Sequence, residues 1–265
     1  MKLHVLVDNN TFIDMYYFGE PGVSYYIEDE DIKILFDTGY SNIFIDNAKK
    51  MNLDLNQVNK LVLSHGHNDH TRGLNYLNLN HKIELLAHPD TFNYKELDGL
   101  SIGIELDIKQ LENKYDLNIS KKPIQISKNI TYLGEIPSLN NFEPRKIIGQ
   151  QKVNHELVND LVLEDTALVY KNENGLFIIT GCSHSGICNI VEYAKQVCHD
   201  SRILGIIGGF HLFEVNDQIL KTIEYFKSNH IERLYPCHCV SLDVKIEMAK
   251  QLKINEVGVG LVIEV

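Results

Sequence analysis

The sequence is poor in cysteine and in cationic residues, and each shortage excludes a class of protein. Its 265 residues include five cysteines, an odd number that is too small for a disulfide scaffold. Lysine and arginine number 25 against 36 aspartates and glutamates, so the formal charge is −11. This balance and the lack of a basic run exclude a typical nucleic-acid-binding protein, because that affinity comes mostly from neutralised phosphates.

Long apolar runs are also missing. No stretch approaches the roughly 18 apolar residues that a membrane helix needs. Residues 1–8 alternate in the manner of a strand and lack the long apolar core of a signal peptide. We therefore expect a cytoplasmic protein with no membrane partner. Its 44% of hydrophobic residues are ordinary for a globular fold.

The residues that are present predict a strand-rich first third and an alternating last third. Short segments rich in Val, Ile, Leu or Tyr predict strands at 3–7, 23–27, 32–36, 60–63 and 83–87, with a helix at 42–51. Further strands are predicted at 167–170, 176–180, 203–207, 233–235 and 257–263, alternating with helices at 187–197, 219–226 and 242–252. Such alternation is typical of an α/β fold in which helices cover a sheet.

The middle of the chain, about 89–150, has weaker periodicity. A helix is predicted at 104–115 and short strands at 124–126 and 130–133. We interpret this region as a small α+β insertion within one domain of residues 1–265. Because loops near a site usually carry specificity, we expect it to pack over or beside the site and to shape the substrate pocket.

Side chains suited to metal binding follow several predicted strands. Residues 64–70, with the sequence SHGHNDH, follow the strand at 60–63, and residues 181–184, with the sequence GCSH, follow the strand at 176–180. The strands at 203–207 and 233–235 lead to His211 and His238. Because carboxyl ends of neighbouring strands meet at one edge of a sheet, these residues are expected to form an active site there.

The segment 65–70 is the strongest signal in the chain. His65 and His67 are two residues apart, so in an extended loop both side chains can chelate one ion. Asp69 and His70 can serve a second ion about 3.5–4 Å away. Asp69 is also the predicted catalytic residue, because it could orient the attacking hydroxide.

Residues 65–70 fit the His-x-His-x-Asp-His signature, and the chain thereby resembles the metallo-β-lactamase superfamily. The resemblance implies an αββα sandwich holding one or two divalent ions, zinc first, with manganese or iron as alternatives. It also implies a hydrolase that acts through a metal-activated water. Phe36-Asp37-Thr38-Gly39 looks like the strand end that precedes the signature. Asp37 would then orient a ligand histidine or, alternatively, cap the next helix, and His238 would complete the second metal site.

Further segments resemble one branch of that superfamily, the branch that includes the synthases joining a dihydropterin to ribofuranosylaminobenzene phosphate. They include residues 34–39, 87–90, 134–137, 179–187, 208–212 and 236–239. This branch implies an alternative chemistry, a transfer that forms a carbon–nitrogen bond with loss of diphosphate. The bacterial members of the branch share the pattern, and the pattern alone does not specify their substrate.

Two departures from the superfamily leave the remaining ligands open. Most members carry a bridging Asp where this chain has Cys182, and the usual third histidine has no clear counterpart. We expect His184 to complete the first metal site, with Cys182 as the rival ligand. His211 is a further candidate ligand, or a residue that touches one.

Two other residues are candidates for substrate binding. Arg72 beside the signature could grip an anion or be a surface arginine, and His88 could line the pocket or be a satisfied core histidine. The sequence therefore predicts a two-metal hydrolase whose substrate is a small molecule, with or without a phosphate group. The alternatives are the transferase, a non-catalytic metal-binding sensor, and a nuclease, which the negative charge disfavours.

Overall fold

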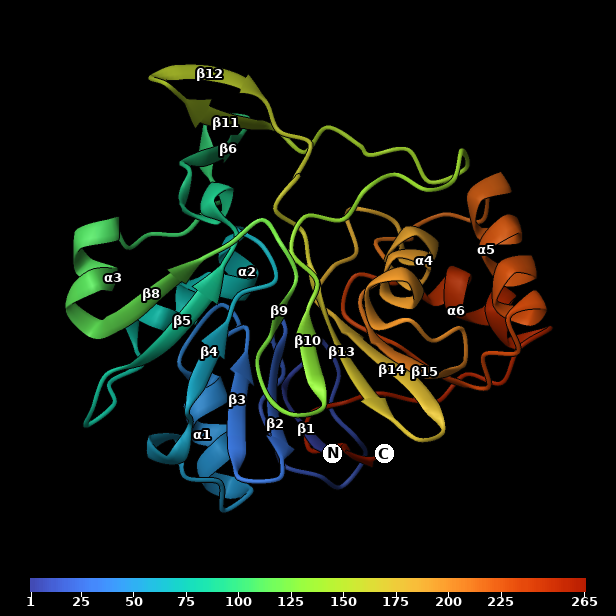
Figure 1. The fold of residues 1–265 in the computed structure, drawn as a ribbon, viewed down its shortest axis with the longest axis horizontal. Coiled ribbons are helices and arrows are strands. Elements are labelled where there is room, and N and C mark those ends of the chain that lie inside the picture. Colours follow the sequence, from blue (N-terminus) through green and yellow to red (C-terminus); the bar gives the residue numbers. More distant parts are fainter. The chain divides into compact units, whose positions relative to one another are not determined.

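The computed structural model describes residues 1–265, and the chain forms two compact units. Unit 1 comprises Met1–Lys121, Ile147–Glu164 and Gly258–Val265, and unit 2 comprises Lys122–Lys146 and Asp165–Val257. Residues 89–150, predicted as an insertion, are therefore divided between the two units. Each unit contains its own main sheet with helices packed on it (Figure 1).

Unit 1 is built on a seven-stranded sheet in the order β17-β1-β2-β3-β4-β5-β8. Its first three strands form antiparallel hairpins: β1 (Lys2–Val7), β2 (Ser24–Asp29) and β3 (Ile32–Phe36). The next three run parallel to β3: β4 (Lys60–Val62), β5 (Ile83–Ala87) and β8 (Tyr115–Ile119). The last strand, β17 (Val262–Glu264), pairs with β1.

Parallel strands need crossover connections, and helices supply them in unit 1. They are α1 (Ile43–Lys50), α2 (Asn68–Thr71) and α3 (Ile108–Lys114), with the short 3₁₀ turns η1 (Leu55–Gln57), η2 (Arg72–Asn75) and η3 (Pro89–Phe92). Phe44 of α1 and Leu111 of α3 join the buried cluster that contains Leu35, Leu61 and Leu85 of the sheet. The helices thus cover one face of the sheet, and the parallel strands end at a common edge.

Unit 1 also contains a small antiparallel sheet in the order β12-β11-β6-β7, drawn at the top of Figure 1. Its strands are β6 (Lys95–Leu97), β7 (Leu100–Ser101), β11 (Gln150–Val153) and β12 (Glu156–Asn159). The polar, short segments that form it gave no strand signal in the sequence. Here pairing between distant segments overrides a weak local preference.

Unit 2 is built on a six-stranded sheet in the order β16-β15-β14-β13-β10-β9. The strands are β9 (Ile124–Gln125), β10 (Ile130–Tyr132), β13 (Ala167–Asn172), β14 (Gly175–Thr180), β15 (Ile203–Gly208) and β16 (Arg233–Pro236). Strands β14, β15 and β16 are parallel, connected through α4 (Ile187–Cys198) and α5 (Asp217–Ser228) and followed by α6 (Leu242–Ala249). One buried cluster joins these helices to the sheet.

The predicted α/β class is confirmed, and most strands lie within a residue or two of their predicted limits. Two predicted elements differ by more than three residues in their limits, and β8 and α2 were not predicted. The helix predicted at 104–115 begins only at Ile108, because Asp107 and Gln110 form a capping box there. The strand predicted at 257–263 is reduced to β17, since Gly260 adopts a left-handed conformation with φ of 95°. None of the helices is both long and apolar enough to cross a membrane.

Candidate metal centre

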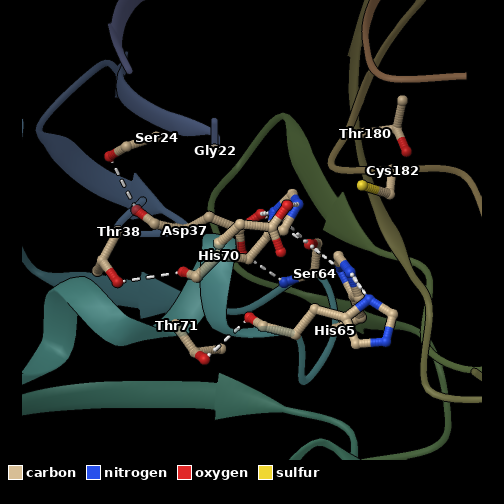
Figure 2. Close-up of polar contacts among 12 residues, drawn as sticks. Gly22, Ser24, Asp37, Thr38, Ser64, His65, His70, Thr71, Thr180 and Cys182 are labelled. Atoms are coloured by element: carbon tan, nitrogen blue, oxygen red, sulfur yellow. Dashed lines mark hydrogen bonds and ion pairs between the residues drawn. The ribbon is translucent and has the colours of Figure 1, made fainter. Parts of the chain in front are cut away.

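The buried carboxylate of Asp37 organises the strand ends of unit 1. Asp37 directly follows β3, and its Oδ1 accepts the backbone N–H of Ser64 at 2.7 Å. Its Oδ2 accepts the hydroxyl of Ser64 at 2.6 Å and lies 2.7 Å from Nδ1 of His70 (Figure 2). All three side chains are inaccessible to solvent. An imidazole that donates from Nδ1 to a carboxylate keeps Nε2 available as a metal ligand.

Ser64 extends this control to a second histidine. Because its hydroxyl proton is donated to Asp37, its oxygen is left to accept from Nδ1 of His65, 2.9 Å away. The Nε2 atom of His65 then carries the lone pair and faces Nδ1 of His67 at 3.0 Å. One carboxylate therefore orients His70 directly and His65 through a serine hydroxyl.

The donor atoms of His65, His67 and Asp69 converge. One ligand atom from each of the three residues lies within 4.8 Å of the others. Two nitrogens bound to a tetrahedral zinc at about 2.0–2.1 Å lie about 3.3 Å apart, close to the 3.0 Å between His65 and His67. The set of two imidazoles and one carboxylate also suits zinc, manganese or iron. These residues therefore fit a divalent metal ion.

The protonation state of His67 suits the same role. Burial lowers its pKa to about 4, and the neighbouring charges of Lys95 and His70 act in the same direction against Asp69. The imidazole is consequently neutral at pH 7, which is the form that binds metals. Asp69 at the start of α2 has a side chain that is 28% exposed, so it stands at the open side of the cluster.

A buried ion cluster supports the loop that carries the histidines. The ammonium of Lys95 lies 2.6 Å from Asp160 and 2.8 Å from Glu164, and all three side chains are inaccessible. Glu164 in turn accepts the backbone N–H of Gly66 at 3.3 Å. A Cβ at Gly66 would lie 2.6 Å from the carbonyl oxygen of Thr91, so only glycine fits between His65 and His67.

The charges in this cluster depend on one another. Burial alone would lower the pKa of Lys95, but Glu164 and Asp160 outweigh it and the pKa is raised. Burial raises the pKa of Glu164, against the pull of Lys95. The lysine therefore remains a cation beneath the loop.

The candidate ligands of unit 2 lie in loops at one edge of its sheet. Gly209 donates its N–H to the carbonyl of Gly181 at 2.8 Å, and the hydroxyl of Ser183 donates to the carbonyl of Gly209 at 2.6 Å. The thiol of Cys239 donates to the carbonyl of Cys182 at 3.5 Å. The loops after β14, β15 and β16 are thereby bonded to each other.

Within this edge, the rings of His184 and His211 are in contact, with centroids 4.3 Å apart. Cys182, in the same loop as His184, is buried, and His238, in the loop after β16, is half-buried. Asp165 anchors the first loop, because its carboxylate accepts both the backbone N–H and the hydroxyl of Ser185. Asp165 thus binds the N–H and hydroxyl of a serine, as Asp37 does in unit 1.

Four of the thirteen non-glycine residues with positive φ lie at these strand ends. Asp37, Ser183, His211 and His238 are non-glycine residues with φ between 50° and 60°. Such left-handed residues are uncommon and are concentrated at functional sites, where the surrounding structure holds them in place. These four residues lie in loops for which the sequence predicted site residues.

The two predicted substrate-binding residues, Arg72 and His88, both make contacts with other residues of the chain. Arg72 forms an ion pair with Glu105 at 2.8 Å and stacks over the ring of Tyr40, with its guanidinium carbon 4.4 Å from the ring centroid. His88 is inaccessible, and its Nδ1 accepts the backbone N–H of Asp90 at 3.1 Å. Each therefore has a structural partner in the described conformation.

Sequence reasoning missed Ser64, Lys95 and Asp165. Ser64 precedes the histidine signature and could have been found from that position alone. Lys95 and Asp165 gave no signal, because their partners lie far away along the chain. The predicted packing of the middle segment near the site does have a counterpart in unit 1, where Asn68 donates its N–H to the carbonyl of Ile102 at 2.8 Å.

Known proteins resemble this chain over most of its length. Residues 17–194 match the Metallo-beta-lactamase superfamily. An uncharacterized protein of Methanocaldococcus jannaschii is 35% identical over 252 residues, which cover 94% of each chain. The 7,8-dihydropterin-6-methyl-4-(beta-D-ribofuranosyl)-aminobenzene-5'-phosphate synthase of the same organism is 29% identical over 272 residues, covering 96% of this chain and 92% of its own.

A solved structure supports the same assignment over the whole chain. The crystal structure of Tm1679, described as a metal-dependent hydrolase of the beta-lactamase superfamily, is 29% identical and has a TM-score of 0.86. The match covers 100% of this chain and 99% of that one. The histidine signature, the fold and the matched residues lead to one conclusion: the chain belongs to the metallo-β-lactamase superfamily.

Proposed function

We propose that this protein is a metal-dependent hydrolase of a small molecule. The observation that carries the proposal is the convergence of His65, His67 and Asp69. The buried carboxylate of Asp37 orients the neighbouring His70. A site with preset histidine tautomers and a partly exposed carboxylate is arranged for chemistry on a ligand that enters from solvent.

In this proposal two divalent ions are bound, zinc first, with manganese or iron as alternatives. His65 and His67 would hold the first ion, and Asp69 and His70 the second. His184, or Cys182 in its place, and His238 are the sequence-predicted ligands that complete the set. Divalent ions held in this way supply Lewis acidity and a water that is activated near neutral pH.

The side chains of the chain itself have separate tasks. Asp69 has a carboxylate in reach of solvent, so it can accept the proton of the attacking water and fix its direction of approach. Asp37 and Ser64 hold two imidazoles in one tautomer throughout the reaction, which avoids reorganisation when charge develops. Attack on an ester-like centre then breaks the bond to its leaving group, and the proton passes to that group.

A second candidate function is a transferase. It is supported by the 29% identity to the dihydropterin-ribofuranosylaminobenzene phosphate synthase over 96% of this chain. In that case the same residues would stabilise a departing diphosphate while a carbon–nitrogen bond forms. A non-catalytic metal sensor is the third alternative.

The test begins with elemental analysis of protein purified without added metal. We expect about two equivalents of zinc, manganese or iron per chain. The metal-loaded protein is then assayed with a phosphodiester, a carboxylic ester and a thioester, in parallel with Asp69→Asn and with Asp116→Asn, an exposed carboxylate of β8 as control. Loss of the general base is expected to lower turnover by about 10²–10⁴-fold in Asp69→Asn alone.

The alternatives give different results. Turnover only with a pterin diphosphate and an aminobenzene nucleophile supports the transferase. Bound metal without turnover of any of these compounds supports the sensor. Wild-type turnover in Asp69→Asn contradicts the assigned role of that carboxylate.

A further inference from the structure

A pocket beside the histidine cluster has mainly apolar walls. It has a volume of about 400 Å³ and is lined by unit 1 alone. Pro21, Tyr40, Ile102 and Ile148 form the walls, and His67, Asn68 and Asp69 form its polar end. This volume is within the usual range of small-molecule sites, which combine apolar walls with a few polar groups.

The walls of this pocket are bonded to the segments that carry the candidate metal ligands. The carbonyl of Ile102 accepts the N–H of Asn68, and the next residue, Gly103, forms an isolated antiparallel bridge with His67. Ile148 donates its N–H to the carbonyl of Asp160, the residue that pairs with Lys95. The apolar walls and the polar end are therefore fixed relative to each other before a ligand arrives.

No lining residue of the pocket is a lysine or an arginine. Arg72 stacks on the wall residue Tyr40, but its charge is compensated by Glu105 at 2.8 Å. A phosphate on the body of a ligand would thus find no cation here, and its desolvation would oppose binding. Among the lining residues, the partners for a charged group lie at the polar end, where a divalent ion would bind.

We propose that the substrate consists of an uncharged, ring-sized apolar body and a single anionic or ester head. The body contacts Ile102 and Ile148, and these two side chains select for it. The inference rests on the proposed function, because it takes His67 and Asp69 to be the reacting end of the pocket. It adds a substrate class: molecules with one head group that binds at the metal centre and with no phosphate on the rest of the molecule.

The test uses binding, measured by calorimetry on the full, zinc-loaded chain, so it does not depend on turnover. The probes are phenylphosphonate, methylphosphonate and inorganic phosphate, which share an anionic head and differ in the apolar body. Each methylene-sized group in a hydrophobic pocket is worth about tenfold or more. We therefore expect phenylphosphonate to bind at least about tenfold more tightly than methylphosphonate.

Two variants test whether the preference for the phenyl group arises in this pocket. Ile102→Asp and Ile148→Asp each introduce a charge at a half-buried wall position and should abolish the phenyl preference. Leu157→Asp, at a 46% exposed position of β12, is the matched control and should retain it. Because both wall positions reach solvent, either variant suffices if the other fails to fold.

The outcomes separate this inference from the proposed function. A phenyl preference that the wall variants lose, in a protein that hydrolyses no ester, supports the pocket and contradicts the hydrolase. Hydrolysis together with equal binding of phenylphosphonate and methylphosphonate contradicts the pocket and leaves the hydrolase standing. A preference that survives in both wall variants also contradicts the pocket.

Discussion

Lys95 and Asp160 form an ion pair with 2.6 Å between the ammonium nitrogen and a carboxylate oxygen, and neither side chain is exposed to solvent. The lysine starts β6, whereas the aspartate follows β12, so the pair joins two distant segments of the small sheet. Glu164 is the second partner of the lysine and also binds the N–H of Gly66. The histidine loop therefore rests on a charged, fully desolvated support.

Lys95→Met tests this support. Removing the cation leaves two buried carboxylates without compensation, so we expect the free energy of unfolding to fall by about 3–5 kcal/mol. Urea denaturation of the metal-free protein measures it. Lys60→Met is the control, because Lys60 and Glu84 form a partly exposed pair at 3.0 Å that should contribute about 0–1 kcal/mol. Equal losses in the two variants would contradict a special role for Lys95.

Ser64→Ala tests the relay from Asp37 to His65. Without the hydroxyl, Nδ1 of His65 loses the acceptor that fixes its tautomer, and zinc affinity should fall by about 10–100-fold. Competition with a chromophoric chelator measures the affinity. Ser24→Ala is a close control, because the hydroxyl of Ser24 is also buried and also binds Asp37, but at its backbone carbonyl. A similar loss of affinity in Ser24→Ala would show that any cavity near Asp37 has this effect.

Glu143→Gln tests a pH dependence in unit 2. Glu143 is buried and accepts the N–H groups of Cys188 and Asn189 at the start of α4, and burial raises its pKa. The folded state then binds this proton more tightly than the unfolded state does. Its contribution to stability is complete below the ordinary value of 4.5 and is lost as the pH rises through the raised pKa.

The measurement is the difference in unfolding free energy between the wild type and Glu143→Gln, in metal-free protein, from about pH 4 to pH 8. The stability of the wild type should decline relative to the variant as the pH rises, because the variant has no proton to lose. Glu112→Gln, on the exposed side of α3, should follow the wild-type profile. A difference that is constant with pH would refute the assignment to Glu143.

His184→Ala and Cys182→Ser decide which residue of unit 2 binds metal. If the imidazole is the ligand, His184→Ala should lose metal and Cys182→Ser should keep it. With cobalt substituted, a thiolate ligand gives a near-ultraviolet charge-transfer band that Cys182→Ser would remove. Retained metal in His184→Ala together with that band would show that the predicted ligand is wrong. His81→Ala, at an exposed position, controls for the loss of any histidine.

The elements that the sequence predicted well are those whose signal is local. β3 and β5 have their predicted limits, because each is a short, mainly apolar segment between polar residues. The small sheet was missed because β11 and β12 are short and mostly exposed, and the pairing of β11 with β6 joins residues that are more than 50 positions apart. Local propensity contains no information about such a contact.

The same contrast between local signals and contacts of distant residues applies to the candidate site. His65, His67 and Asp69 were found because their spacing alone suits a metal ion, and the structure brings them together. Lys95 was not found, because a single lysine in a polar stretch is ordinarily exposed and its partner is 65 residues away. Arg72 was open to two interpretations, and only the position of Glu105 shows that its charge is compensated within the protein.

The pairing of β17 with β1 has a consequence for biosynthesis. β17 follows all of unit 2 in the sequence, yet it completes the sheet of unit 1 beside the first strand. While the ribosome is translating residues 165–257, the outer edge of β1 therefore has no β17 to pair with. An open, apolar strand edge is a template for association with other chains. Nascent chains stalled within unit 2 should consequently expose this strand edge until residues 262–264 have been made.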